Sequence, residues 1–179
     1  MGVINLPNTL TLMRIILLPL FVASMIYRRY DYALYIFSVA AITDTLDGLI
    51  ARLKGLKTPL GTLLDPLADK FLLVTSFILL AVYNFIPLWL TITVISRDII
   101  IVTGWIVFYL VSHSAKVEPS ITGKIAISLQ LILIWYILLD VNIPVMPDLH
   151  SYLIYLTALF TILSGLHYIY RGLRESRAY

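Results

Sequence analysis

Long apolar runs alternate with short polar breaks along the whole chain. The breaks are rich in charged residues, asparagine and proline. A helix needs about 20 residues to cross the hydrocarbon core of a bilayer, and the runs lack the alternation of membrane-barrel strands. The pattern therefore predicts an all-α integral membrane protein. Six transmembrane helices are expected, over residues 8–27, 32–53, 61–83, 87–111, 120–139 and 149–171.

Proline positions agree with this division. Four prolines lie near expected helix starts, where a missing N–H costs least: Pro59, Pro66, Pro87 and Pro119. Pro19 lies inside the first span and is expected to kink it. Arg14 lies within that apolar run and no small-residue cleavage site follows, so we expect the span to be retained. No span stands apart from the others, which predicts a single domain over residues 1–179.

Composition supports a membrane protein. The 179 residues are 60% hydrophobic and 13% charged, against about 25% charged in an average soluble domain. The chain has no cysteine, which excludes disulfides and thiolate metal ligands. The net charge of +3 is modest. We interpret it as attraction to anionic lipid headgroups rather than as nucleic-acid binding.

The basic residues predict the orientation, because cytoplasmic flanks are enriched in lysine and arginine. With the N-terminus inside, eight basic residues flank the cytoplasmic ends of the spans: Arg52, Lys54, Lys57, Lys116, Lys124, Arg171, Arg174 and Arg177. The opposite side has only Arg28 and Arg29. Both termini are therefore expected in the cytoplasm.

Four of the ten acidic residues fall within 26 positions, across the end of the second span and the start of the third. Residues three or four apart share a helix face. Asp44 and Asp47 therefore form one stripe and Asp65 and Asp69 another, and a short connection lets the stripes face each other. Carboxylates this close need a counterion, and charge within a membrane is costly. The spacing predicts a site for a hard divalent cation with oxygen ligands.

Small residues accompany the carboxylates. Gly48 and Ala51 lie on the first stripe and Gly61 on the second. They remove side-chain bulk where a ligand approaches the backbone, although close packing of membrane helices also favours small residues. Arg52 adjoins the first stripe. It suits either phosphate binding through its planar donor fork or an anchoring position at the membrane surface.

Together these residues resemble the signature of the CDP-alcohol phosphotransferase (phosphatidyltransferase) family, D-x2-D-G-x2-A-R-x8-G-x3-D-x3-D. Every defined position is present at the required spacing: Asp44, Asp47, Gly48, Ala51, Arg52, Gly61, Asp65 and Asp69. The motif covers 26 residues, and the six-span pattern extends the resemblance along the chain.

The resemblance implies a metal-dependent enzyme of phospholipid synthesis, which transfers a phosphatidyl group from CDP-diacylglycerol to an alcohol and releases CMP. Asp44, Asp47 and Asp65 would be the main ligands of a Mg²⁺ or Mn²⁺ pair, and Asp69 would complete the site and act as general base. The cytidine and diphosphate would be held by Gly48, Ala51, Arg52 and Gly61. A homodimer in the cytoplasmic membrane, with its active site facing the cytoplasm, is also expected.

The acceptor alcohol is predicted from residues that lie outside the motif. The N-terminal segment with Arg14, and the surroundings of Arg97 and Lys124, resemble bacterial phosphatidylglycerophosphate synthases and the related cardiolipin synthases. An arginine deep in a span usually faces a cavity. We therefore expect Arg97 and Lys124 to form a phosphate pocket suited to glycerol 3-phosphate. The alternatives are an Arg97 ion pair with Asp98 or a motif aspartate, and a Lys124 that extends to the membrane surface.

One departure bears on the acceptor. Phosphatidylglycerophosphate synthases tend to carry a second lysine where this chain has Ala126. Cardiolipin synthases, which use phosphatidylglycerol as the alcohol, tolerate that loss and are the alternative. A small cation transporter is the rival from another class, since carboxylates also line ion paths. That class has no use for the glycines, alanine and arginine at fixed distances.

Overall fold

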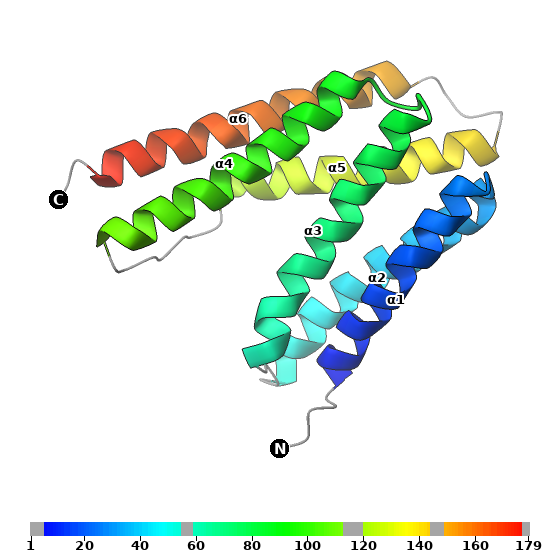
Figure 1. The fold of residues 1–179 in the computed structure, drawn as a ribbon, viewed down its shortest axis with the longest axis horizontal. Coiled ribbons are helices and arrows are strands. Elements are labelled where there is room, and N and C mark those ends of the chain that lie inside the picture. The colour runs from blue at the N-terminus through cyan, green and yellow to red at the C-terminus, as the bar shows by residue number, and fades with distance from the viewer. Residues whose placement is uncertain (1–5, 55–58, 113–119, 144–148, 177–179) are drawn as a thin grey trace. The chain divides into compact units, whose positions relative to one another are not determined.

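The computed structural model describes residues 6–54, 59–112, 120–143 and 149–176, with the side chains of 13–43, 70–104, 106, 120–143, 149–172 and 174. Helices are the only regular secondary structure in these residues (Figure 1). They are α1 (Leu6–Ile26), α2 (Tyr30–Lys54), α3 (Pro59–Val82), α4 (Leu88–Ser112), α5 (Ile121–Asn142) and α6 (His150–Ser176). The described part of the chain is all-helical, as predicted, with one helix for each expected span.

The helices gather into two units. The first contains α1, α2, α3 as far as Leu79 and the C-terminal part of α5 from Trp135. The rings of Phe21 and Phe37 pack between α1 and α2 with centroids 6.0 Å apart, and both side chains are fully buried. The indole of Trp135 donates a hydrogen bond to Ser38 Oγ at 3.2 Å, which joins α5 to α2.

The second unit contains the end of α3, α4, the N-terminal part of α5, and α6. Its apolar core includes Leu90 and Val94 of α4 and Leu133 of α5, all fully buried. Polar side chains are buried beside them. Gln130 of α5 donates to Thr161 Oγ1 of α6 at 3.0 Å, so that hydrogen bond satisfies groups otherwise costly to bury.

Two helices end in the same cap. Arg28 follows α1 with φ 56° and Asn84 follows α3 with φ 61°. After each, the next residue's N–H reaches back five positions, from Arg29 to Ser24 O at 2.8 Å and from Phe85 to Leu80 O at 2.8 Å. This is the Schellman motif, which usually places glycine at the left-handed position.

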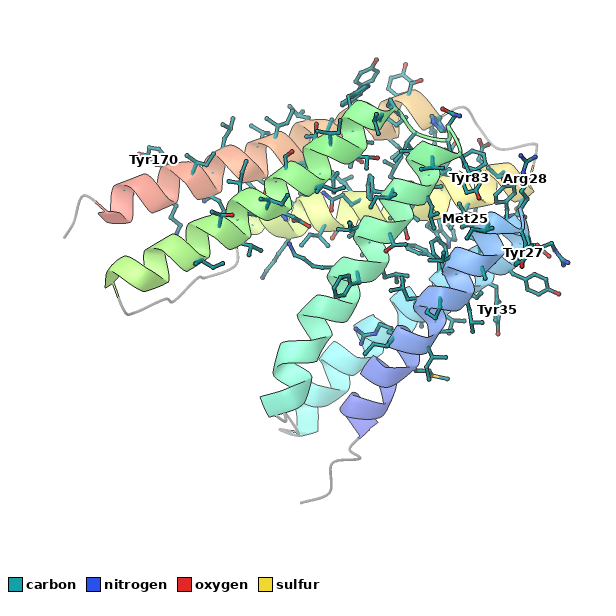
Figure 2. All side chains as sticks on the ribbon, viewed as in Figure 1. Met25, Tyr27, Arg28, Tyr35, Tyr83 and Tyr170 are labelled. Carbon is teal, nitrogen blue, oxygen red and sulfur yellow. The ribbon has the colours of Figure 1, made fainter. Side chains whose placement is uncertain are left out.

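The turn between α1 and α2 carries exposed aromatic and basic side chains. Tyr27 and Arg28 point away from the helices there (Figure 2). Arg29 donates to the carboxylate of Asp31 at 3.1 and 3.2 Å and stacks on Tyr32, with its Cζ 4.4 Å from the ring centroid. The hydrogen bonds from Arg29 hold the pKa of Asp31 below its ordinary value. Aromatic residues of this kind favour a membrane interface.

Large apolar side chains face outward on the helices, among them Ile16, Val82 and Leu88 with 61%, 66% and 65% exposed. Two helical stretches, Ile121–Asn142 and His150–Gly172, are long and apolar enough to cross a membrane. Shorter apolar stretches occur in α1 and α3 among the residues described. Helices that present apolar side chains outward as well as inward are typical of proteins that lie in a bilayer. The chain is therefore a membrane protein.

The helix bounds differ from the sequence-based spans at a few ends. The polar residues Tyr30 and Asp31, expected to be a break, form the first turn of α2. α5 continues to Asn142, past the expected end at residue 139. Pro59 begins α3 as expected, whereas Pro66 lies well inside that helix rather than at its start.

Candidate active site

The eight motif positions lie on two consecutive helices. Residues 44–52 belong to the end of α2, which finishes at Lys54, and residues 61–69 belong to the start of α3, which begins at Pro59. The backbone is helical at every motif position, but the side chains of all eight lie outside the described residues: Asp44, Asp47, Gly48, Ala51, Arg52, Gly61, Asp65 and Asp69. Their convergence on one metal site stays a prediction.

The helical backbone gives the aspartates the spacing that the sequence analysis used. Asp44 and Asp47 are one turn apart on an unbroken α2, and Asp65 and Asp69 are one turn apart on α3. The C-terminal end of α2 and the N-terminal end of α3 lie at the same end of the first unit (Figure 1). A donor set of four carboxylates is all oxygen, which suits Mg²⁺ or Mn²⁺.

The first unit also buries a cation that the sequence analysis did not assign to the site. Arg14 of α1 is only 3% exposed and interacts with another part of the protein. A buried charge in a membrane protein is retained where it has a structural or functional use. An arginine within an apolar run is the sequence signal that marks it, although the run does not show whether the side chain faces protein or lipid.

In the second unit, Arg97 of α4 is 6% exposed and donates three hydrogen bonds. Its Nη1 donates to Asp98 Oδ1 at 2.8 Å. Its Nε and Nη2 both donate to Ser164 Oγ of α6, at 3.3 and 2.8 Å. The structure thus contains the Arg97–Asp98 ion pair, one of the two roles that the sequence left open for Arg97.

The guanidinium of Arg97 lies against the first turn of α5. Arg97 Nη2 is 3.1 Å from the place that a Cβ on Gly123 would occupy. Ser120 caps this turn, since its Oγ accepts from the Gly123 N–H at 3.0 Å, and its own N–H donates to Tyr168 Oη at 3.4 Å. A helix start carries partial positive charge from its unpaired N–H groups. The arginine and the helix start therefore concentrate positive potential at one place.

Lys124 follows Gly123 in that turn, and its side chain is exposed. Both residues predicted for the acceptor phosphate consequently belong to the same region of the second unit. Ala126, where the related synthases tend to carry a lysine, is fully buried. A lysine side chain in its place would have to enter the packed interior. The region brings together Arg97 and the start of α5, with Lys124 in the same turn, and it has no third cation at position 126.

Comparisons with known proteins agree with the motif. The model of the CDP-alcohol phosphatidyltransferase family matches residues 4–163. A probable phosphatidylglycerophosphate synthase of Mycobacterium tuberculosis is 32% identical over 181 residues, which cover 96% of this chain and 83% of that protein. The CDP-diacylglycerol–glycerol-3-phosphate 3-phosphatidyltransferase of Bacillus subtilis is 33% identical, covering 92% of this chain and 93% of its own length.

Cardiolipin synthases also match this chain, over a smaller share of their own length. The CMP-forming cardiolipin synthase of Rattus norvegicus is 34% identical over 148 residues, which cover 73% of this chain and 48% of that protein. The family match spans both units and includes the helix ends that carry the complete motif. Because the match takes in most of the chain, this protein belongs to the CDP-alcohol phosphatidyltransferase family.

Proposed function

We propose that this protein transfers the phosphatidyl group of CDP-diacylglycerol to glycerol 3-phosphate, forming phosphatidylglycerophosphate and CMP. The observation that carries the proposal is the complete eight-residue motif at the end of α2 and the start of α3, in a chain of apolar helices. A lipid-linked donor also accounts for placing this chemistry in a membrane protein. The names of the bacterial relatives point to the same reaction.

The reaction breaks the phosphoanhydride bond of the donor and forms a new phosphate ester. A hydroxyl oxygen of glycerol 3-phosphate attacks the phosphorus that carries the diacylglycerol, and the bond from that phosphorus to the CMP oxygen breaks. The hydroxyl proton must be removed as the new P–O bond forms. We assign its removal to Asp69, because a carboxylate within hydrogen-bond reach of the hydroxyl can act as general base.

The remaining motif residues bind the donor. In this proposal Asp44, Asp47, Asp65 and Asp69 would hold two Mg²⁺ or Mn²⁺ ions, which would supply positive charge to neutralise the diphosphate and the leaving CMP. The cytidine and diphosphate lie along the motif's small residues and arginine, namely Gly48, Ala51, Arg52 and Gly61. Gly and Ala let the nucleotide approach the helices, and Arg52 pairs with a phosphate oxygen.

Arg97 and Lys124 bind the phosphate of the acceptor. Support comes from the position of the Arg97 guanidinium at the start of α5, one residue from Lys124. The proposal also includes six membrane spans, with both termini and the active site in the cytoplasm. It further includes a homodimer. The excess of basic residues on one side of the expected spans supports the orientation.

Phosphatidylglycerol, the acceptor of cardiolipin synthases, is the second candidate. The buried Ala126 favours it, because the acceptor region then has one cation fewer for a phosphorylated small molecule. The Bacillus subtilis enzyme is matched over 93% of its own length and the rat cardiolipin synthase over 48%, which favours glycerol 3-phosphate. We rank glycerol 3-phosphate first because Arg97 and Lys124 remain to bind a phosphate dianion.

An acceptor panel tests the function. Purified protein with CDP-diacylglycerol and Mg²⁺ is incubated separately with glycerol 3-phosphate, phosphatidylglycerol, serine or inositol phosphate, and CMP release is followed. We expect release with glycerol 3-phosphate above the no-acceptor control, loss of release with EDTA, and recovery on adding Mg²⁺ or Mn²⁺. If only phosphatidylglycerol supports CMP release, the second candidate is selected. If none of the acceptors gives release above the no-acceptor control, the transferase is refuted.

A further inference from the structure

The side chain of Arg97 is enclosed on two sides. Its stem lies over Gly165 of α6, where an added Cβ would be 3.6 Å from Arg97 Cγ, an ordinary contact distance. Its guanidinium lies between Ser164 of α6 and Gly123 of α5. Tyr168 adds a ring whose centroid is 6.0 Å from Arg97 Cζ. Residues of α5 and α6 thus define where the charged group of this α4 side chain lies.

Ser164 occupies one particular edge of the guanidinium. Nε–H and one Nη2–H lie parallel on the same edge of the planar group, and Ser164 Oγ accepts from both. Asp98 accepts from Nη1. Arginine has five N–H donors. One N–H on each terminal nitrogen therefore has no hydrogen-bond partner among the described residues. The remaining Nη2–H points along the end of the guanidinium, away from Ser164.

Gly123 determines how closely that group approaches α5. A Cβ at this position would be 3.1 Å from Arg97 Nη2 and 3.0 Å from Ser120 Oγ, tighter than nine in ten real contacts of a Cβ. An alanine there would push the guanidinium away from the first turn or disturb the Ser120 cap. Gly104 of α4 offers a contrast, because a Cβ there meets nothing within 4 Å.

We propose that Ser164 and Gly123 are positioning residues for the acceptor phosphate: Ser164 orients the Arg97 guanidinium, and Gly123 admits it to the start of α5. The inference rests on the proposed function, in which Arg97 binds that phosphate. A bidentate arginine–phosphate contact requires a fixed guanidinium plane. Removing either support leaves the charge in place but loosens the geometry, which raises the KM for the acceptor more than that for the CDP-lipid.

The first test removes the hydroxyl of Ser164 in one variant and keeps it in another. Ser164→Ala should raise the KM for glycerol 3-phosphate by about tenfold, since hydrogen bonds to charged groups are the stronger ones. The KM for CDP-diacylglycerol should stay within about twofold of the original, because only the acceptor uses Arg97. Ser164→Thr keeps the hydroxyl and should restore the acceptor KM. The matched control is Thr157→Val, which removes a buried α6 hydroxyl that has no hydrogen-bond partner among the described residues.

The second test approaches Arg97 from the other side and does not depend on Ser164. Gly123→Ala should raise the acceptor KM in the same selective way, whereas Gly104→Ala should leave both KM values unchanged. Thermal unfolding in detergent accompanies each variant. If the Ser164 variants fail to fold, the comparison of Gly123→Ala with Gly104→Ala alone tests the proposal. A Gly123→Ala protein with an unchanged acceptor KM then overturns it.

The KM values of these variants distinguish failure of this inference from failure of the proposed function. If Arg97→Ala raises the acceptor KM while Ser164→Ala and Gly123→Ala do not, the acceptor pocket stands and the positioning roles are refuted. Equal increases in both KM values for Ser164→Ala would also refute them, since the effect would then be general. If the unaltered protein releases no CMP with glycerol 3-phosphate, both proposals are overturned.

Discussion

At the scale of single residues, two buried arginines show what local sequence does and does not reveal. Arg14 and Arg97 both lie in apolar runs, and both are buried, with 3% and 6% exposed. Charge in an apolar run was enough to mark Arg97 as functional or structural. It could not identify Ser164 as its partner, because that residue is 67 positions away on another helix. An Arg97–Asp98 pair between neighbours was foreseeable, and the structure contains it.

Among single residues, Asp69 has the most specific proposed role, that of general base. Asp69→Asn keeps the size of the side chain and an oxygen ligand but removes the base. We expect CMP release to fall by about 10²–10⁴-fold, the contribution typical of general base catalysis. Binding of CDP-diacylglycerol should be largely intact, measured directly by titration with the lipid in detergent.

The matched control for Asp69 is a carboxylate outside the motif. Asp140 lies near the end of α5, and Asp140→Asn should retain full turnover. An Asp69→Asn protein with unchanged turnover would remove Asp69 from the base role. Loss of both lipid binding and turnover would instead assign it to donor binding.

At the scale of elements, apolar run length predicted all six helices, while their ends depended on contacts that hydropathy does not contain. α5 continues to Asn142 because the Asn142 side chain donates to Leu138 O at 2.7 Å and to Tyr30 O at 3.0 Å. α2 starts at Tyr30, with Asp31 in its first turn, where negative charge favours the helix dipole. These polar residues were assigned to breaks because a local pattern shows their polarity and not their partners.

The cap after α1 supplies a stability prediction. Arg28 holds φ 56°, a conformation that costs an L-residue about 1–2 kcal/mol and glycine almost nothing. Glycine also loses more backbone entropy on folding, so Arg28→Gly should stabilise the protein by a net of about 0.5–1 kcal/mol. The measurement is thermal unfolding of the purified protein in detergent.

Two further variants separate strain from charge at that turn. Arg28→Ala removes the charge but keeps a Cβ, so it should give no gain. Asn84→Gly changes the equivalent cap after α3, where asparagine already tolerates the left-handed region, and should stabilise less than Arg28→Gly. A larger gain from Arg28→Ala than from Arg28→Gly would show that charge, not backbone strain, limits this turn.

At the scale of the whole molecule, the sequence predicted the family and the helices that carry its motif, but not the contacts around Arg97. The motif assigned eight residues to the ends of two helices, and the helices are there. The proposed acceptor region combines α4, α5 and α6, and includes a close approach of Arg97 to Gly123 that only tertiary packing creates. Helical spacing predicts which residues share a face of one helix. It does not predict which faces of different helices meet.

Orientation in the membrane is the prediction that belongs to the whole molecule. The chain has no cysteine, so each single cysteine introduced is the sole target for a maleimide. Tyr27 is 78% exposed at the turn between α1 and α2 (Figure 2). In the proposed topology this turn faces outward, whereas the α2–α3 connection and the end of α6 face the cytoplasm.

In intact cells, a membrane-impermeant maleimide should therefore label Tyr27→Cys, while Lys57→Cys and Ser176→Cys should react only after permeabilisation. Asn84→Cys, in the turn after α3, should behave like Tyr27→Cys, because crossing one more pair of spans returns the chain to the outer side. Labelling of Lys57→Cys in intact cells would place the motif outside. A cytoplasmic pool of CDP-diacylglycerol headgroups and glycerol 3-phosphate could not then reach the site, so the orientation and the proposed acceptor would fail together.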